Sequence, residues 1–196
     1  MKVMEFSEGN LEKLVLIAQD SLKKGKVIVC PTDTIYGFIA DAENAKAVEK
    51  IFRIKHRKKE KPLGIFVKDL AMAKKIARVS SSQERFFKKA WPGKVTAVLQ
   101  VKKKFPKGVG TEKTIGIRVS KYYFLDLLFL KFNHAIAQTS VNISDTAPLK
   151  RVRDMVQVFG KRKWKPGLIL DAGALPLSRP SKVIDMATGK NKILRT

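Results

Sequence analysis

The stretch KVIVCPTDTIYGF, residues 26–38, decides the fold because it joins an apolar strand directly to a cluster of polar side chains. Residues 26–31 form an apolar run that ends at a proline, which predicts a short buried strand. Thr32, Asp33, Thr34 and Tyr36 follow in a turn that ends at Gly37. Ligands of open α/β sheets bind where strands deliver their ends into a shared crevice. We therefore expect this polar turn to face a ligand.

Helical and strand patterns alternate outward from this stretch. Helices are predicted at residues 11–22, 44–54, 69–77, 82–90, 122–132 and 151–159. Further strands are predicted at residues 62–67, 94–101, 114–119, 135–139, 168–171, 182–186 and 193–195. Several connections are too short to cross over between parallel neighbours. The pattern indicates an α/β fold in which helices flank a sheet of mixed direction.

Length and composition indicate one globular unit. The chain has 196 residues, 44% of them apolar, and we expect a single domain over residues 1–196 with no second domain. No apolar run approaches the roughly 18 residues of a membrane span, and residues 1–7 lack a secretory signal pattern. We expect a soluble, cytoplasmic protein without a membrane partner. One cysteine and two histidines make a structural metal site unlikely on chemical grounds.

The net charge is the strongest compositional signal. The chain carries 41 basic and 17 acidic side chains, a formal charge of +24. Such an excess creates a positive potential that attracts polyanions. Lysine-rich runs at residues 102–104 and 161–163 fit either the backbone of a nucleic acid or the phosphates of a nucleotide substrate. Charge alone does not distinguish a nucleic-acid-binding protein from an enzyme with a nucleotide substrate. It also does not distinguish either of them from a basic surface that serves solubility or an unusual ionic environment.

Polar and basic clusters also occur at residues 55–63, 139–142 and 180–185. Hydroxyls, amides, lysines and arginines together describe a pocket for an anionic small molecule. The chain lacks a G-x-x-x-x-G-K-[ST] phosphate loop, a G-x-G-x-x-G fingerprint and a G-x-S-x-G elbow. Only His56 and His134 could serve as a base for a serine nucleophile. Once these motifs and a serine nucleophile are set aside, the remaining mechanism is catalysis by positioning and electrostatics, in which the substrate supplies the nucleophile.

The clusters coincide with those of a known family, because the sequence resembles the YrdC-like proteins. The matching motifs lie in the family's order at residues 31–37, 55–63 (K-x-R-x-x-x-K-P-L), 91–93 with Thr96, 116–118, 139–142 and 180–185. The resemblance implies a twisted α/β sheet with a large, basic, concave cavity. It also implies a threonylcarbamoyl-AMP synthase that joins L-threonine, bicarbonate and ATP, with Mg²⁺ on the nucleotide, and releases pyrophosphate.

The resemblance implies roles for individual residues. Lys55 and Arg57 would be catalytic, balancing the charges of the carbamate and the triphosphate. The residues that would bind substrate are Thr32, Thr34, Tyr36, Lys61, Arg118 and Ser181. Of these, Arg118 would bind a carboxylate or a phosphate, and Ser181 the threonyl or the phosphate end. Those that would bind the nucleotide, besides Lys55 and Arg57, are Thr139, Ser140, Asn142 and Arg195. The Trp91–Pro92–Gly93 motif is expected to end a helix and pack the core.

The resemblance also implies a downstream partner, and the net charge of +24 supports an alternative function. The product would pass to a separate tRNA threonylcarbamoyl transferase. The sequence departs from the family at Phe66, where some members have histidine, at Val141, where alanine is usual, and at Ser120, near which a proline is common. Two alternatives stay open: a non-catalytic protein that binds tRNA or double-stranded RNA, and a paralogue with another carbamoyl or carboxylate substrate.

Overall fold

The computed structural model describes residues 1–7, 9–188 and 191–196. Six helices occur in these ranges: α1 (Leu11–Lys23), α2 (Ala45–Lys55), α3 (Leu70–Ile76), α4 (Ser81–Ala90), α5 (Tyr123–Lys131) and α6 (Val152–Phe159). The same ranges contain ten strands: β1 (Lys2–Glu5), β2 (Ile28–Cys30), β3 (Gly37–Asp41), β4 (Gly64–Phe66), β5 (Val95–Gln100), β6 (Thr114–Arg118), β7 (Ile136–Ser140), β8 (Leu168–Asp171), β9 (Lys182–Asp185) and β10 (Lys192–Arg195).

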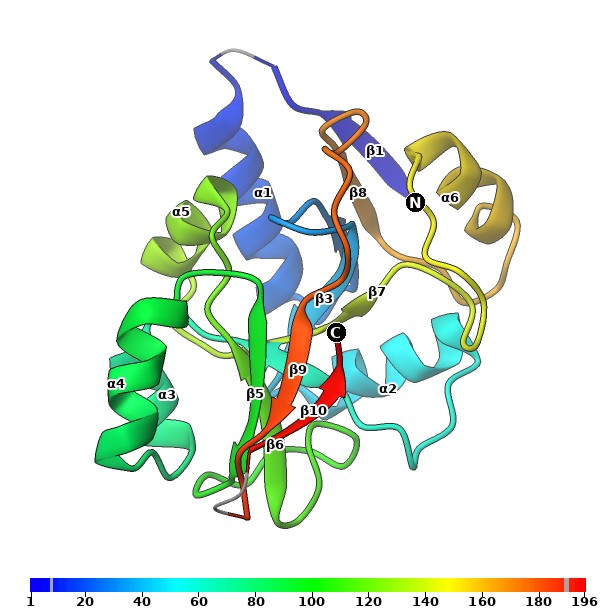
Figure 1. Ribbon diagram of the computed structural model, residues 1–196. Helices are drawn as coiled ribbons and strands as arrows, with labels where there is room; N and C mark the ends of the chain where they lie inside the picture. Colours follow the sequence, from blue (N-terminus) through cyan, green and yellow to red (C-terminus); the bar gives the residue numbers. More distant parts are fainter. Residues whose placement is uncertain (8, 189–190) are drawn as a thin grey trace.

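All of these strands belong to one sheet, in the order β1-β8-β2-β3-β7-β4-β6-β5-β9-β10 (Figure 1). The β1/β8, β8/β2, β4/β6 and β5/β9 pairs are parallel, and the other five pairs are antiparallel. The predicted mixed α/β sheet flanked by helices is confirmed. No helix in the described ranges is both long and apolar enough to cross a bilayer.

Side chains alternate between two cores on opposite faces of the sheet. In β2, Val29 faces the core that contains α2, α3, α4 and α6, whereas Ile28 and Cys30 face α1 and α5. This follows from the two-residue period of a strand. In Figure 1, α1 and α5 lie side by side, as their mutual contacts require. Both faces of the β8-β2-β3 region are therefore covered, which explains the continuous apolar run in the sequence.

The face that α1 and α5 cover is left open farther along the sheet. Strands β7, β4, β6 and β5 direct alternate residues toward this open part, where they line a cavity. Their intervening residues, among them Ala97, Ile117 and Ala137, are fully buried in the opposite core. Gly64 and Gly116 lie on the cavity side, so the sheet backbone itself forms part of the cavity floor.

Local side-chain bonds fix the start of three helices. The carboxamide of Asn44 and the carboxylate of Asp69 each accept a backbone N–H in the first turn of α2 and α3. Ser80 and Gln83 form a reciprocal capping box at α4. These caps explain why the predicted helix boundaries agree closely with the observed ones.

Two strands were missed by the sequence analysis. The edge strand β1 has mostly exposed residues, so its alternation carries no hydrophobic signal. Strand β3 starts at Gly37, where we predicted only the end of a turn. Glycine and alanine favour strands weakly, but β3 is held between β2 and β7, and this tertiary pairing outweighs local preference.

The glycine in the cavity floor gives a first prediction. A Cβ atom added to Gly116 meets its nearest neighbour, Thr96 Cγ2, at 3.5 Å, an ordinary contact. Gly116→Ala is therefore expected to fold normally, and Gly116→Val also, because β-branched residues favour strands. The valine methyl groups would occupy the cavity, so a ligand of the cavity should bind more weakly in the order Gly, Ala, Val. Calorimetry with ATP and with L-threonine, the ligands that the family resemblance implies, would measure this. If the wild type, Gly116→Ala and Gly116→Val all fold and bind these ligands equally, residue 116 does not lie in the cavity floor.

Candidate active site

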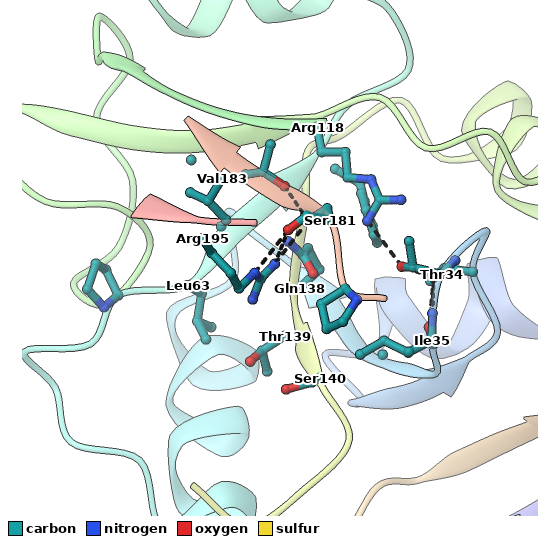
Figure 2. Close-up of a pocket in the computed structure, with 18 of the residues that line it drawn as sticks. Thr34, Ile35, Leu63, Arg118, Gln138, Thr139, Ser140, Ser181, Val183 and Arg195 are labelled. Atoms are coloured by element: carbon teal, nitrogen blue, oxygen red, sulfur yellow. Dashed lines mark hydrogen bonds between the residues drawn. The ribbon is translucent and has the colours of Figure 1, made fainter. Parts of the chain in front are cut away.

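The cavity has a volume of about 380 Å³ and gathers residues from both halves of the chain (Figure 2). This volume lies within the usual range of roughly 300–1,000 Å³ for small-molecule sites. The turn before β3, the loop after α2, and strands β4 to β7, β9 and β10 all contribute to the lining. Nine of the residues implied by the resemblance line it, namely Thr32, Thr34, Tyr36, Arg57, Arg118, Thr139, Ser140, Ser181 and Arg195.

Arg118, the last residue of β6, is held by a buried ion pair. Its Nη2 donates to Asp33 Oδ1 at 2.7 Å, and the two side chains are only 4% and 8% exposed. Its Nε donates to the carbonyl of Gly93 at 2.9 Å, and its Nη1 donates to Thr34 Oγ1 at 3.2 Å. The guanidinium is therefore fixed by groups from two other segments of the chain, and it lines the cavity in one orientation.

The turn predicted before Gly37 is present, and its hydroxyls mainly hold the turn itself. Thr32 Oγ1 accepts the backbone N–H groups of Thr34 and Ile35 and donates to the carbonyl of Ile35. Tyr36 donates to the carbonyl of Gly173 at 2.8 Å and accepts from the backbone after β8. Burial is the main cause of its raised pKa. These residues shape the wall, and the turn positions Thr34 beside Arg118.

Ser181 and Arg195 join β9 and β10 at the cavity. Arg195 donates from Nε and Nη2 to the carbonyl of Ser181, at 2.9 and 2.7 Å, and from Nη2 to its Oγ at 3.1 Å (Figure 2). The same Oγ lies 2.8 Å from Thr96 Oγ1 on β5. Although β10 is an exposed strand, these bonds hold Arg195 against a buried serine at the cavity.

Arg57 lines the cavity from the loop that follows α2. Its Nε donates to the carbonyl of Lys61 at 2.6 Å, and its Nη2 donates to that of Pro62 at 3.2 Å. Lys61 itself does not line the cavity; its ammonium pairs with Asp145 at 2.5 Å, and both side chains are exposed. The predicted contact of Lys61 with a substrate thus has no support in the geometry and stays a prediction.

Lys55 lies behind the cavity rather than in it. It is 1% exposed, and its Nζ donates to the carbonyls of Ser140 and Asn142, at 2.5 and 3.0 Å, and to Asn142 Oδ1 at 2.6 Å. Asn142 also accepts from Ser140 Oγ, and its amide nitrogen donates to two carbonyls of the following loop. Neither Lys55 nor Asn142 is among the lining residues. In this structure the pair holds the loop after β7, and through it Ser140.

The charged part of the lining consists of three arginines, Arg57, Arg118 and Arg195, and the lining of the described chain includes no aspartate or glutamate. Burial lowers the pKa of each guanidinium, although Asp33 opposes this at Arg118 and Asp145 does so at Arg57. The charge of Arg195 also lowers the pKa of Arg118, so these two guanidiniums repel each other. A bound anion would relieve both the desolvation and the repulsion.

Three site features were missed by the sequence analysis. Gln138 lines the cavity two residues before Ser140, so strand alternation could have identified it. Thr96 was noted only as part of a motif, yet it bonds Ser181 in the lining. Asp33 reaches Arg118 across 85 positions of sequence, a pairing that no local pattern predicts. Trp91 stacks on Phe87 and caps α4, which confirms the structural role expected for that motif.

The buried ammonium of Lys55 predicts how the stability of the protein depends on pH. Burial, and next the charge of Arg57, lowers the pKa of Lys55 to about 7, whereas an unfolded lysine keeps its proton up to about pH 10. Between these values the unfolded chain binds more protons, so the folded state gains stability as pH rises. Relative to Lys55→Met, the unfolding free energy of the wild type should therefore increase from about pH 7 to about pH 10.

Urea denaturation of both proteins across that range measures the difference, and Lys46→Met on the exposed side of α2 serves as the matched control. The control should show no such trend. A difference between wild type and Lys55→Met that does not change with pH would mean that the three oxygen acceptors retain the proton throughout.

Comparisons with known proteins show the family to which this chain belongs. The family model for Sua5, YciO and YrdC proteins, described as "Telomere recombination", matches residues 20–196. A Methanocaldococcus jannaschii protein is 31% identical over 97% of this chain and 88% of its own length. A Photobacterium profundum protein named threonylcarbamoyl-AMP synthase is 31% identical over 78% of this chain and 82% of its own.

A solved structure of Sua5 from Pyrococcus abyssi, complexed with L-threonine, superposes with a TM-score of 0.90 at 27% identity. The match covers 100% of this chain and 57% of that one, so this chain spans little more than half the length of that protein. Together with the motifs, the sheet and the cavity, these similarities establish that the chain belongs to the Sua5/YciO/YrdC family.

Proposed function

We propose that this chain is a threonylcarbamoyl-AMP synthase, which forms threonylcarbamoyl-adenylate and pyrophosphate from L-threonine, bicarbonate or CO₂, and ATP. One observation carries the proposal: a single cavity holds a fixed, ion-paired arginine at Arg118 and two further arginines, Arg57 and Arg195. A carboxylate and a polyphosphate can therefore bind in the same space. Relatives of similar length with that name support the assignment.

The end of the cavity near Arg118 suits the amino acid. Arg118 keeps unused N–H groups, because three of its five are bonded within the protein. The hydroxyls of Thr34 and Ser181 lie in the same lining. A guanidinium with neighbouring hydroxyls is well suited to a carboxylate. The P. abyssi structure with L-threonine supports this assignment by analogy.

Arg57 and Arg195, with Thr139 and Ser140, would hold the nucleotide. Their guanidiniums are bonded only to backbone carbonyls and a serine hydroxyl among the described residues, so their charge is available to the phosphates. Lys55 would act through Ser140 by holding the loop after β7. Mg²⁺ would arrive on ATP as part of the substrate.

The reaction needs no protein nucleophile. The threonine amine would attack carbon dioxide or bicarbonate to give a carbamate, with loss of a proton or of water respectively. A carbamate oxygen would then attack the α-phosphorus of ATP, and the bond to the β-phosphate oxygen would break to release pyrophosphate. Negative charge accumulates on the phosphates in this step, where Arg57 and Arg195 would stabilise it. The threonylcarbamoyl-adenylate would pass to a tRNA threonylcarbamoyl transferase.

The charge of +24 supports a second candidate, binding of tRNA or double-stranded RNA. This activity does not require the cavity, because the lysine-rich runs at 102–104 and 161–163 lie outside its lining. RNA binding would weaken steeply with salt, whereas formation of the adenylate would depend on threonine and bicarbonate. The two functions can therefore be measured independently.

The decisive assay is pyrophosphate release from Mg²⁺-ATP, with threonine and bicarbonate each present or omitted, and with serine in place of threonine. Release that requires both co-substrates and prefers threonine is the expected result. Pyrophosphate release that depends on neither threonine nor bicarbonate would refute the proposed reaction. Release that requires a different amino acid or carboxylate would indicate the paralogue with another substrate.

Two cavity variants test the assigned roles. Arg57→Ala should lower kcat/KM by roughly a hundredfold, because it removes a cation from the developing charge. Arg118→Ala should act mainly by raising the KM for threonine. Arg85→Ala, on the exposed side of α4, removes the same charge far from the lining and serves as the control. If the Arg57 or Arg118 variant folds and matches the control, that assignment is wrong.

A further inference from the structure

The three arginines of the cavity differ in the groups that compensate their positive charge. Arg118 forms a buried ion pair with Asp33, at 2.7 Å between Nη2 and Oδ1. Within the described residues, Arg57 and Arg195 form no ion pair, and their hydrogen-bond acceptors are the neutral oxygens of Lys61, Pro62 and Ser181. One end of the cavity thus carries a compensated cation, and the remaining lining carries two cations without a carboxylate in direct contact.

Asp33 is held behind Arg118 and is not itself in the lining. Its Oδ1 also accepts the hydroxyl of Ser120, and its Oδ2 accepts the backbone N–H of Lys121 at 3.2 Å. Its side chain is 8% exposed, so water screens its charge weakly. The carboxylate therefore acts on a ligand in two ways, by orienting the Arg118 guanidinium and by reducing the positive potential in front of it.

These effects favour different anions. A monoanionic carboxylate needs mainly the two N–H groups that Arg118 has left, which the ion pair orients. A phosphate or pyrophosphate carries more charge, so the nearby carboxylate repels it more strongly. Arg57 and Arg195 have no such carboxylate bonded to them among the described residues and favour the more highly charged ligand.

We propose that Asp33 determines which anion each end of the cavity accepts: it reserves the Arg118 end for the carboxylate of the amino acid by excluding phosphate groups from it. This inference rests on the proposed function, in which an amino acid and ATP share the cavity. Both substrates carry anionic groups, the carboxylate of the amino acid and the phosphates of ATP, so without Asp33 a phosphate group could occupy the place of the amino acid carboxylate. Asp33 is a positioning residue, since it acts through Arg118.

The test compares wild type with Asp33→Asn, which keeps the shape of the side chain and removes its charge. Calorimetric titrations use inorganic pyrophosphate alone, L-threonine alone, and L-threonine in the presence of saturating pyrophosphate. In the wild type, pyrophosphate should leave the apparent Kd for threonine nearly unchanged. In Asp33→Asn it should raise that Kd by roughly tenfold or more, because one buried unit charge has been removed beside the ligand.

Asp33→Asn should also bind pyrophosphate more tightly or at an additional site. A variant that is merely destabilised cannot gain affinity, so this readout separates the proposal from a purely structural role. Asp20→Asn is the matched control, because it removes the same charge from an exposed carboxylate that pairs with Lys24 at the end of α1, outside the cavity lining. Competition between pyrophosphate and threonine should not change in this control.

Equal competition in wild type and in folded Asp33→Asn would overturn the proposal. If Asp33→Asn does not fold, the wild-type protein alone decides. Strong displacement of threonine by pyrophosphate would then refute the exclusion of phosphate groups from the Arg118 end. Little or no displacement would support it. A wild type that binds no threonine would refute the proposed function. The affinity and number of pyrophosphate sites in the two proteins would then still decide the role of Asp33.

Discussion

The cavity depends on the buried ion pair between Asp33 and Arg118. A guanidinium that is 4% exposed is stable only if its charge and its N–H groups are compensated, and Asp33, Thr34 and the carbonyl of Gly93 provide this. The pair joins the turn after β2 to the end of β6, two segments far apart in the sequence. The same contact thus closes one wall of the cavity and orients a cation within it.

A second constraint is the unequal cover of one face of the sheet. Helices α1 and α5 pack against the β8-β2-β3 region and reach Ile136 of β7 and Phe66 of β4, whereas farther along β7, β4, β6 and β5 the same face lines the cavity. An uncovered apolar sheet face would be unstable in water. Apart from Phe66 and Val98, the residues of these strands that line the cavity are polar, small or basic, including Thr96, Gly116 and Gln138, so the face is suited to a polar ligand.

Much of the fold could be predicted because its local signals agree with its tertiary structure. Helices such as α2 and α4 and buried strands such as β2 were found from the periodicity and the runs of their apolar residues. Strands β1 and β3 were not, since one is an exposed edge and the other starts at a glycine that we had placed at the end of a turn. Their pairing is set by neighbouring strands, which a linear pattern does not contain.

The candidate site shows the same limit at the level of single residues. The K-x-R pattern led us to treat Lys55 and Arg57 as one pair. Helix α2 ends at Lys55, and His56 adopts a left-handed conformation with φ of 50°. The chain therefore changes direction between them, so Lys55 points to the loop after β7 and Arg57 lines the cavity. The spacing of the two residues in the sequence does not reveal this divergence, and the catalytic roles of Lys55 and Arg57 stay predictions.

The most direct test of the account is a crystal structure with L-threonine and a non-hydrolysable ATP analogue bound together. The account predicts the threonine carboxylate within hydrogen-bonding distance of Arg118, and the phosphates beside Arg57 and Arg195. Lys55 should keep its bonds to the loop after β7. Phosphates on Arg118, or threonine outside the cavity, would contradict the central claim that the ion pair with Asp33 separates the two anions.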